Sequence, residues 1–153
     1  IFYFNPNIYP PQEYSRRLEE LRRMLKDMDS TAVLIEGAYE PHIFSKIAHG
    51  HESDAERGPR CSLCYALRLE ETAKQAAKDG FDYFATTLSI SPHKDAAKLN
   101  ELGLALSAKY EVDYLVSDFK KKNGYLRSLE LSRQYGLYRQ EYCGCMHSMR
   151  PQG

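Results

Sequence analysis

Hydrophobic and polar positions follow two different periodicities along this chain. Four short runs rich in β-branched and aromatic residues predict strands at residues 1–4, 31–35, 82–88 and 112–116. Between these runs, apolar residues recur every three or four positions, as in amphipathic helices. Because strands alternate with helices, we expect an α/β fold made of βαβ units. The expected architecture is a single domain, residues 1–153, with a Rossmann-like parallel sheet and helices on both faces.

The first predicted helix opens at Pro10 and Pro11 and has one apolar stripe. The stripe consists of Tyr14, Leu18, Leu21, Leu25 and Met28. The arginines of this helix lie off the stripe among glutamates, at Arg16, Arg17, Arg22 and Arg23. A charged face of this kind is more often solvated than bound to RNA, so we expect these arginines to face solvent.

Four further helices are bounded by glycine, proline and capping residues. A short helix carries Ile43, Phe44 and Ile47, and the next helix ends at Gly80, where a glycine suits the turn after a helix. Ser91 is expected to cap the fourth helix, with Pro92 at its first position. The last helix runs from a turn at Gly124 to Gly136.

Polar residues follow the predicted strands directly. The segments are 5–7, 36–37, 91–94 and 118–122. In parallel α/β sheets, ligands bind outside the carboxyl ends of the strands, so we expect these segments to share one functional edge. A polar loop at residues 49–60 is long for a compact domain, which also favours a functional role.

The amino-acid composition excludes few classes of protein. The chain has 21 basic and 21 acidic residues, so no overall positive field marks a nucleic-acid-binding protein. No apolar run is long enough for a membrane span, and we expect a cytoplasmic protein with no membrane partner. The chain begins with Ile1 instead of methionine, and we expect it to be incomplete at the N-terminus.

All four cysteines lie in two close pairs, Cys61-x-x-Cys64 and Cys143-Gly144-Cys145. A C-x-x-C at a helix start fits a structural zinc half-site, a thioredoxin-type dithiol or half of an iron–sulfur site. The thioredoxin interpretation is the weakest, because such motifs normally follow a strand. Thiols one residue apart can close a strained disulfide, a kind that is often labile or catalytic. These residues favour a metal- or cluster-dependent oxidoreductase, with a structural-zinc nucleic-acid-binding module as the alternative.

Three motifs, in this order, carry a resemblance to a known family. The first is Glu56-Arg57-Gly58-x-Arg60-Cys61-x-x-Cys64-x-x-x-Arg68-Leu69. The second is Phe81-Asp82-Tyr83-Phe84-x-Thr86-Thr87-Leu88 with Ser91-Pro92-x-Lys94. The third is Tyr138-Arg139-Gln140-x-Tyr142-Cys143-Gly144-Cys145. The chain resembles epoxyqueuosine reductases of the QueH type over nearly its whole length.

The resemblance implies an iron–sulfur enzyme that removes the epoxide oxygen of epoxyqueuosine in a tRNA anticodon, giving queuosine. It also implies that Cys61 and Cys64 help to hold a 4Fe–4S cluster, and that Cys143 and Cys145 form a redox-active pair. In the family, adjacent cysteines before the segment that begins here at Ile1 complete the cluster ligands. We therefore expect this chain to bind a cluster poorly, unless Cys143 and Cys145 act as ligands instead.

Epoxide removal requires two electrons and two protons, and a cluster supplies electrons singly. A second redox group, either the Cys143 and Cys145 thiols or an additional iron bound by them, would deliver both electrons at one site. Asp118 is the first candidate for the acid that protonates the departing oxygen, and it could equally be a metal ligand. The expected tRNA or substrate contacts are Arg60, Arg68, Lys94, Lys120 and Arg139. The electron donor is not identified by the sequence.

Overall fold

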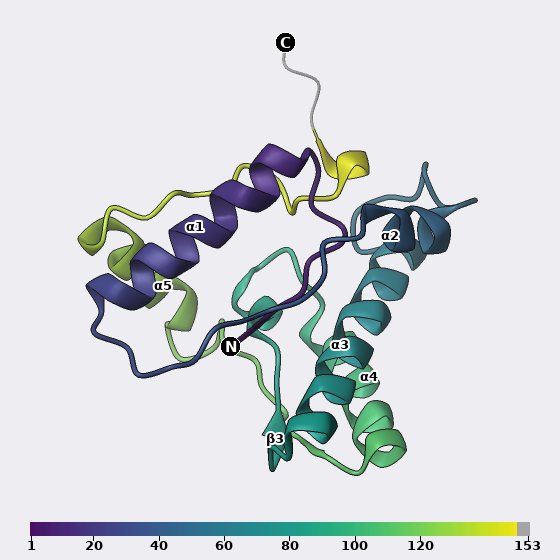
Figure 1. The fold of residues 1–153 in the computed structure, drawn as a ribbon. Helices are drawn as coiled ribbons and strands as arrows, with labels where there is room; N and C mark the ends of the chain where they lie inside the picture. The colour runs from purple at the N-terminus through teal and green to yellow at the C-terminus, as the bar shows by residue number, and fades with distance from the viewer. Residues whose placement is uncertain (150–153) are drawn as a thin grey trace. The chain divides into compact units, whose positions relative to one another are not determined.

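Five α-helices and four two-residue strands form the part of the chain that the computed structural model describes, residues 1–149 (Figure 1). In order they are β1 (Phe2–Tyr3), α1 (Pro11–Asp27), β2 (Ile35–Glu36), α2 (Pro41–Ala48), α3 (Pro59–Asp79), β3 (Tyr83–Phe84), α4 (Ala96–Tyr110), β4 (Asp113–Tyr114) and α5 (Gly124–Gln134). Two short 3-10 turns, η1 (Thr87–Ile90) and η2 (Met146–Ser148), complete the set. No helix in residues 1–149 is long and apolar enough to cross a membrane.

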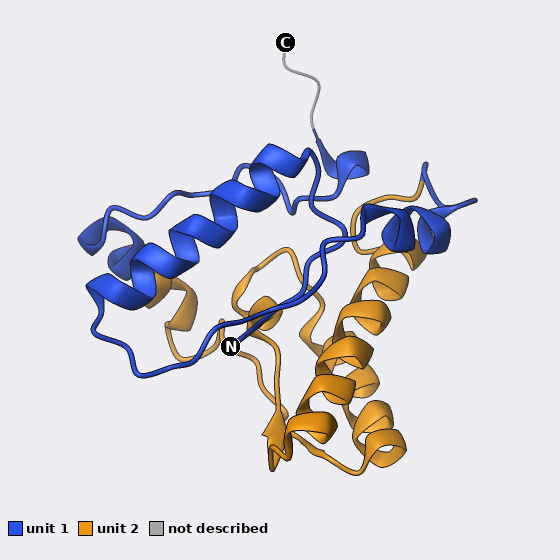
Figure 2. Cartoon of the chain, viewed as in Figure 1, with its two compact units in different colours: residues 1–53, 130–153 blue, residues 54–129 orange. Residues whose placement is uncertain are grey.

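The chain divides into two compact units, coloured separately in Figure 2. Unit 1 comprises residues 1–53 and 130–153, and unit 2 comprises residues 54–129. Unit 1 contains β1, α1, β2, α2 and the C-terminal segment with Cys143 and Cys145. Unit 2 contains α3, β3, α4 and β4, and therefore Cys61 and Cys64. The expectation of a single domain stays a prediction.

The expected strands are present, but they are shorter than predicted. β1 pairs with β2 in parallel and β3 pairs with β4 in parallel, so each unit has its own two-stranded ladder within residues 1–149. The chain is mixed α/β and mostly helical, and the Rossmann-like sheet with helices on both faces is not confirmed. One physical reason is visible after β3, where the Thr86 hydroxyl accepts a hydrogen bond from the Leu88 amide at 3.2 Å. This contact starts η1 and turns the chain away from extended pairing.

Helix boundaries agree with the sequence except before α4. Gly80 ends α3 in the left-handed conformation, with φ 70°, as predicted. The prediction that Ser91 and Pro92 begin the fourth helix is wrong, because α4 starts at Ala96. Asp95 caps it by accepting a hydrogen bond from the Lys98 amide at 3.0 Å. Ser91 instead closes a local turn, in which its hydroxyl and carbonyl oxygens accept bonds from the His93 and Lys94 amides.

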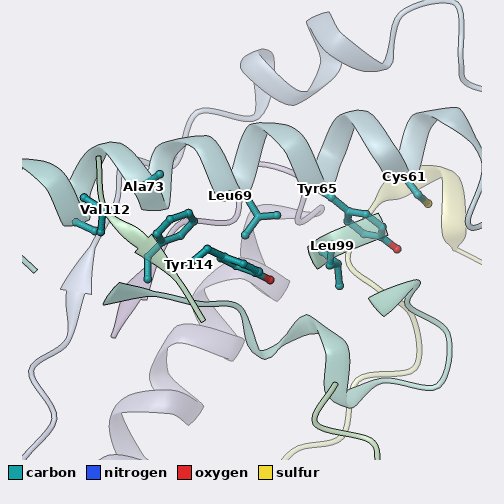
Figure 3. Close-up of a cluster of buried hydrophobic side chains, with 9 residues drawn as sticks. Cys61, Tyr65, Leu69, Ala73, Leu99, Val112 and Tyr114 are labelled. Atoms are coloured by element: carbon teal, nitrogen blue, oxygen red, sulfur yellow. The ribbon is translucent and has the colours of Figure 1, made fainter. Parts of the chain in front are cut away.

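The core of unit 2 fixes the helix that carries the first cysteine pair. Side chains of α3 face α4 and the β3–β4 pair, and Leu69, Ala73 and Leu99 are 2%, 0% and 0% exposed (Figure 3). The rings of Phe84 and Tyr114, on the two paired strands, lie 5.1 Å apart. Cys61 lies at one end of this cluster, so the start of α3 is held by the same packing.

Adding one methyl group at Gly103 should strain this core. A Cβ atom at Gly103, on α4, would lie 2.4 Å from the Tyr114 ring. We expect Gly103→Ala to lower the free energy of unfolding by about 1–3 kcal/mol, because the packed ring has to move. The matched control is Glu101→Ala on the exposed side of α4, expected to stay within about 0.5 kcal/mol of wild type. Urea unfolding midpoints measure both; equal midpoints would show that the ring yields freely.

The core of unit 1 lies under α1 and confirms much of its predicted stripe. Tyr14 and Leu18 are buried beside Tyr3 and Ile8, and Leu21 packs against them. The Tyr14 ring stacks on Tyr39 at 4.0 Å. Because this apolar face is turned inward, the opposite polar face of α1 remains for other contacts.

Candidate active site

The first cysteine pair lies in the opening turn of α3. Cys61 and Cys64 are both buried, at 9% exposure each, and their spacing of three places them on one face of the helix. Pro59 occupies the start of the helix, where a missing amide hydrogen costs nothing. A helix N-terminus carries partial positive charge, a setting that suits either metal ligation or redox chemistry.

The polar loop before α3 supports this turn directly. Gly58 has no side chain to cap the helix, and Asp54 serves instead: its Oδ2 accepts a hydrogen bond from the Arg60 amide at 2.8 Å. Arg57 has a left-handed backbone, with φ 73°, and its amide donates a hydrogen bond to Cys61 Sγ at 3.3 Å. The loop that was expected to be functional therefore holds the first cysteine. The roles of Asp54 and of the Arg57 amide were missed from the sequence.

Four of the expected tRNA-binding cations lie in unit 2, and three of them, Arg60, Arg68 and Lys94, are buried or half-buried. Arg60 is buried at 3% exposure, and Arg68 is half-buried one helical turn after Cys64. Lys94 is 8% exposed, and its Nζ lies 3.4 Å from Glu56 Oε1, in the loop before α3. Contact with tRNA phosphates stays a prediction for all three residues.

The thiols of Cys61 and Cys64 fit two positions of a cluster ligand set. A 4Fe–4S cluster takes four cysteine thiolates, and α3 supplies two from one face. Within residues 1–149, no three His, Cys, Asp or Glu side chains are grouped so that they could hold one metal ion. Ligation by Cys61 and Cys64 therefore remains a prediction.

The second cysteine pair lies in a short loop of unit 1 that packs against the N-terminal turn. The Tyr9 amide donates a hydrogen bond to the Gly144 carbonyl at 2.9 Å. Gly144 has φ 105°, and a Cβ there would lie 2.8 Å from Ile8 Cγ1, so only glycine fits without strain. Cys145 is buried at 6% exposure, whereas Cys143 is partly exposed.

Ser148 links the two cysteines on the other side of the loop. Its hydroxyl lies 3.0 Å from Cys143 Sγ and donates to the Cys145 carbonyl at 2.8 Å. The Ser148 amide also donates to the Cys145 carbonyl, at 2.9 Å, which closes η2. Ser148, which follows the pair in the chain, is therefore hydrogen-bonded to both cysteines.

Arg17 of α1 holds the same loop from outside. Its Nη2 donates to the Tyr142 carbonyl at 3.0 Å, and its Nη1 donates to the Cys143 carbonyl at 3.2 Å. Its Nε donates to Glu13 Oε1 at 2.7 Å, one helical turn earlier. The guanidinium also lies 5.2 Å from the centre of the Tyr142 ring.

Other polar residues of α1 bind the segment that leads to the cysteines. Arg23 donates to the carbonyls of Tyr135 and Gly136, both at 3.1 Å. Glu20 accepts from the Tyr138 amide at 2.6 Å, and Arg16 lies 3.5 Å from the centre of the Tyr138 ring. The expected solvated face is therefore wrong for Arg17, which is half-buried, whereas Arg16, Arg22 and Arg23 are exposed as expected. Arg16 and Arg23 nevertheless also contact the segment that leads to the cysteines.

These contacts also affect titration. The Arg23 hydrogen bond, followed by the Tyr138 amide, lowers the pKa of Glu20. Burial, followed by the hydrogen bond to Glu13, raises the pKa of Tyr138. In the sequence, the polar face of α1 is visible as polar residues that repeat at steps of three and four. That repeat alone does not show whether the face contacts water or another segment of the chain.

Asp118 and Lys120 form an ion pair in unit 2. Lys120 Nζ lies 2.8 Å from Asp118 Oδ1, and Lys121 Nζ lies 3.8 Å from Oδ2. Asp118 also lines an open cavity of about 530 Å³, together with Asn100, Val116, Ser117, Phe119, Lys121 and Lys122. The hydrogen bond from Lys120 lowers the pKa of Asp118, which favours the ionised carboxylate. A proton donor must start protonated, so the proposed acid role stays a prediction without support from this pKa.

The Asp118 pKa gives a direct test of this pairing. We expect Lys120→Gln to raise the Asp118 pKa towards its ordinary value of 3.8, because the main stabilising bond is lost. The matched control, Lys121→Gln, should raise it less, since that contact is longer. In wild type, stability from a lowered carboxyl pKa is present above the unfolded-state pKa and is lost as pH falls through the folded-state pKa. Carboxyl-carbon NMR titration measures the shift; equal shifts in the two variants would contradict the assignment.

The last expected contact, Arg139, is exposed in the segment before the second cysteine pair. Arg139 belongs to unit 1, and its exposed side chain is accessible to a phosphate group from solvent. Binding of tRNA by Arg139 or by Lys120 stays a prediction.

Comparison with known proteins adds a consistent set of relatives. The family model described as "Epoxyqueuosine reductase QueH" matches residues 1–151. Proteins with the same name from Streptococcus pyogenes and Staphylococcus epidermidis are 40% and 42% identical over 100% of this chain, which covers 62% and 67% of their lengths. One from Thermotoga maritima is 32% identical over 97% of this chain, which covers 78% of its length. The chain thus spans about three fifths to four fifths of these relatives.

Proposed function

The chain belongs to the epoxyqueuosine reductase QueH family, and on this premise we propose that it reduces epoxyqueuosine in a tRNA anticodon to queuosine. The observation that carries the proposal is the match over residues 1–151, which includes both cysteine pairs. The local structure supports the proposal, because specific hydrogen bonds fix the backbone or sulfur atoms of each cysteine pair.

The Cys143 and Cys145 thiols can supply everything that the reduction consumes. Both epoxide C–O bonds break, a C=C bond forms and the oxygen leaves as water, which requires two electrons and two protons. Oxidation of the two thiols to one disulfide releases two electrons and two protons, so the step balances. A reductant from outside the chain, of a class still to be identified, must then return the pair to its dithiol form.

Cys61 and Cys64 would hold part of a 4Fe–4S cluster in this proposal. When bound, such a cluster would pass electrons one at a time. The protein contributes a buried helix turn, an amide hydrogen bond to Cys61 and a carboxylate cap from Asp54. Hydrogen bonds to cluster sulfurs and burial are two of the features by which a protein adjusts iron–sulfur chemistry. An additional iron held by Cys143 and Cys145 is the other proposed use of the second pair.

The tRNA would be bound through its phosphates, and the modified base would leave the anticodon stack to reach the thiols. Arg139 and Lys120 are the proposed contacts that the structure leaves partly or fully exposed. Lys94, Arg60 and Arg68 would act closer to the first cysteine pair.

The function is tested with tRNA that carries epoxyqueuosine, incubated without oxygen with the protein and a chemical reductant. Nuclease digestion and mass spectrometry are expected to show that the modified nucleoside loses one oxygen atom. Metal analysis on the same sample measures iron and acid-labile sulfide, which we expect to stay below one cluster per chain unless Cys143 and Cys145 complete the ligand set. An unchanged nucleoside would contradict the proposal, and stoichiometric zinc without iron would support the structural-zinc nucleic-acid-binding module instead.

A further inference from the structure

We propose that Arg17 is a positioning residue for the Cys143–Cys145 pair. By holding the backbone of the loop that carries the two cysteines, Arg17 sets the equilibrium between their dithiol and disulfide forms. This inference rests on the proposed function only in giving the pair a redox role. Arg17 lies on α1, more than a hundred positions before the cysteines in the sequence, and touches neither sulfur in the contacts described above. It would therefore act through the chain that carries them.

The guanidinium of Arg17 is fixed in a single arrangement by its partners. Its two Nη atoms donate to successive carbonyls, Tyr142 and Cys143, while Nε donates to Glu13. The Arg17 side chain is only 10% exposed, and its Glu13 partner is 11% exposed. A planar fork with all three nitrogens engaged gives geometric specificity that a lysine cannot reproduce.

The loop that carries the two cysteines packs closely against the Arg17 guanidinium at Gly144. A Cβ at Gly144 would lie 3.0 Å from Arg17 Nη1. The Gly144 carbonyl accepts the Tyr9 amide of the N-terminal turn. The backbone around Cys143 is therefore held between α1 and the N-terminal turn, and its torsion angles are restricted by both contacts.

This restraint matters because two cysteines one residue apart can close a disulfide only in a narrow range of backbone geometry. Fixing the Cys143 carbonyl limits the torsions that closure must change. Loss of Arg17 should therefore make the disulfide more stable relative to the dithiol.

The test is the thiol–disulfide equilibrium of the full chain with dithiothreitol. In it, oxidised dithiothreitol takes two electrons and two protons from Cys143 and Cys145, giving the protein disulfide and reduced dithiothreitol. Alkylation of the remaining thiols, followed by peptide mass spectrometry, reports the Cys143–Cys145 peptide separately from Cys61 and Cys64. We expect Arg17→Gln to shift the equilibrium constant towards the disulfide by roughly tenfold, the scale of one charge-assisted hydrogen bond.

The matched control is Arg22→Gln on the same helix, whose partners are Glu19 and Glu36, and it should leave the equilibrium unchanged. Arg17→Lys keeps the charge and loses the fork, and should shift the equilibrium in the same direction by a smaller factor. If Arg17→Gln does not fold, as judged by circular dichroism, Arg17→Lys decides the question. An equilibrium equal to wild type in the folded Arg17 variants would overturn the proposal. Because no epoxyqueuosine is used, a shift here with no tRNA reduction would refute only the function.

Discussion

Replacing Cys143 with serine is expected to abolish the reduction of epoxyqueuosine. Serine keeps the branching and approximate shape of the side chain and can still hydrogen-bond Ser148, but it cannot give up electrons. We expect the single-turnover rate to fall by at least about 100-fold, the low end of what loss of a directly reacting group costs. Cys145→Ser should have the same effect, since one thiol cannot form the disulfide alone. Quench-flow sampling with nucleoside mass spectrometry measures both rates.

The first cysteine pair provides the control for this experiment. Any iron and sulfide that the chain binds through Cys61 and Cys64 alone should be unchanged in the Cys143→Ser variant, because neither of those two thiols is altered. Loss of activity with the iron retained would separate the redox pair from the cluster. A variant that lost its iron as well would instead place Cys143 among the metal ligands, and a fully active variant would remove it from the mechanism.

Gly144→Ala is expected to displace the loop that carries the second pair. Its φ of 105° is unfavourable for any residue with a Cβ, and that Cβ would lie 2.8 Å from Ile8 Cγ1. Backbone strain and overpacking together should cost about 2–4 kcal/mol of unfolding free energy. A displacement of about 1 Å at the reacting thiols can lower a rate about 100-fold, so we expect activity to fall on that scale.

Gly136→Ala tests the effect of backbone strain without displacement of the cysteine loop. Gly136 also has a positive φ, 55°, but no atom lies within 4 Å of a Cβ built there. We expect this substitution to cost about 1 kcal/mol through strain alone. Its reduction rate should match that of wild type. Thermal unfolding and single-turnover rates, measured side by side, test the pair. If both variants behaved alike, the close packing of the loop against Ile8 would have no role in activity.

Much of the helical structure could be predicted from the sequence, because it depends on local pattern. The apolar stripe of α1 and the glycine that ends α3 follow from spacing and from backbone freedom at one position. The sheet could not be predicted in the same way. Strand length depends on which segments pair, and the turn begun by Thr86 ends β3 after two residues. The start of α4 was misplaced because Ser91 caps its own turn.

The residues of the candidate site fall into the same two groups: those that a local sequence pattern predicts and those that depend on the tertiary fold. The cysteine pairs are visible in the sequence because their chemistry requires close spacing. The residues that hold them are less visible, because they act across the fold. Arg17 reaches Cys143 over 126 positions, and no local pattern distinguishes it from Arg22, which remains on the surface. Asp54 acts over six positions, but its capping role depends on how the loop turns before α3.

The most direct measurement follows the thiols and the nucleoside in one reaction. The protein is reduced, freed of excess reductant without oxygen, and mixed with tRNA carrying epoxyqueuosine. Samples are then alkylated and analysed by mass spectrometry for both the nucleoside and the Cys143–Cys145 peptide. The proposed mechanism requires one Cys143–Cys145 disulfide for each queuosine formed. Formation of queuosine while both thiols remain open to alkylation would contradict it.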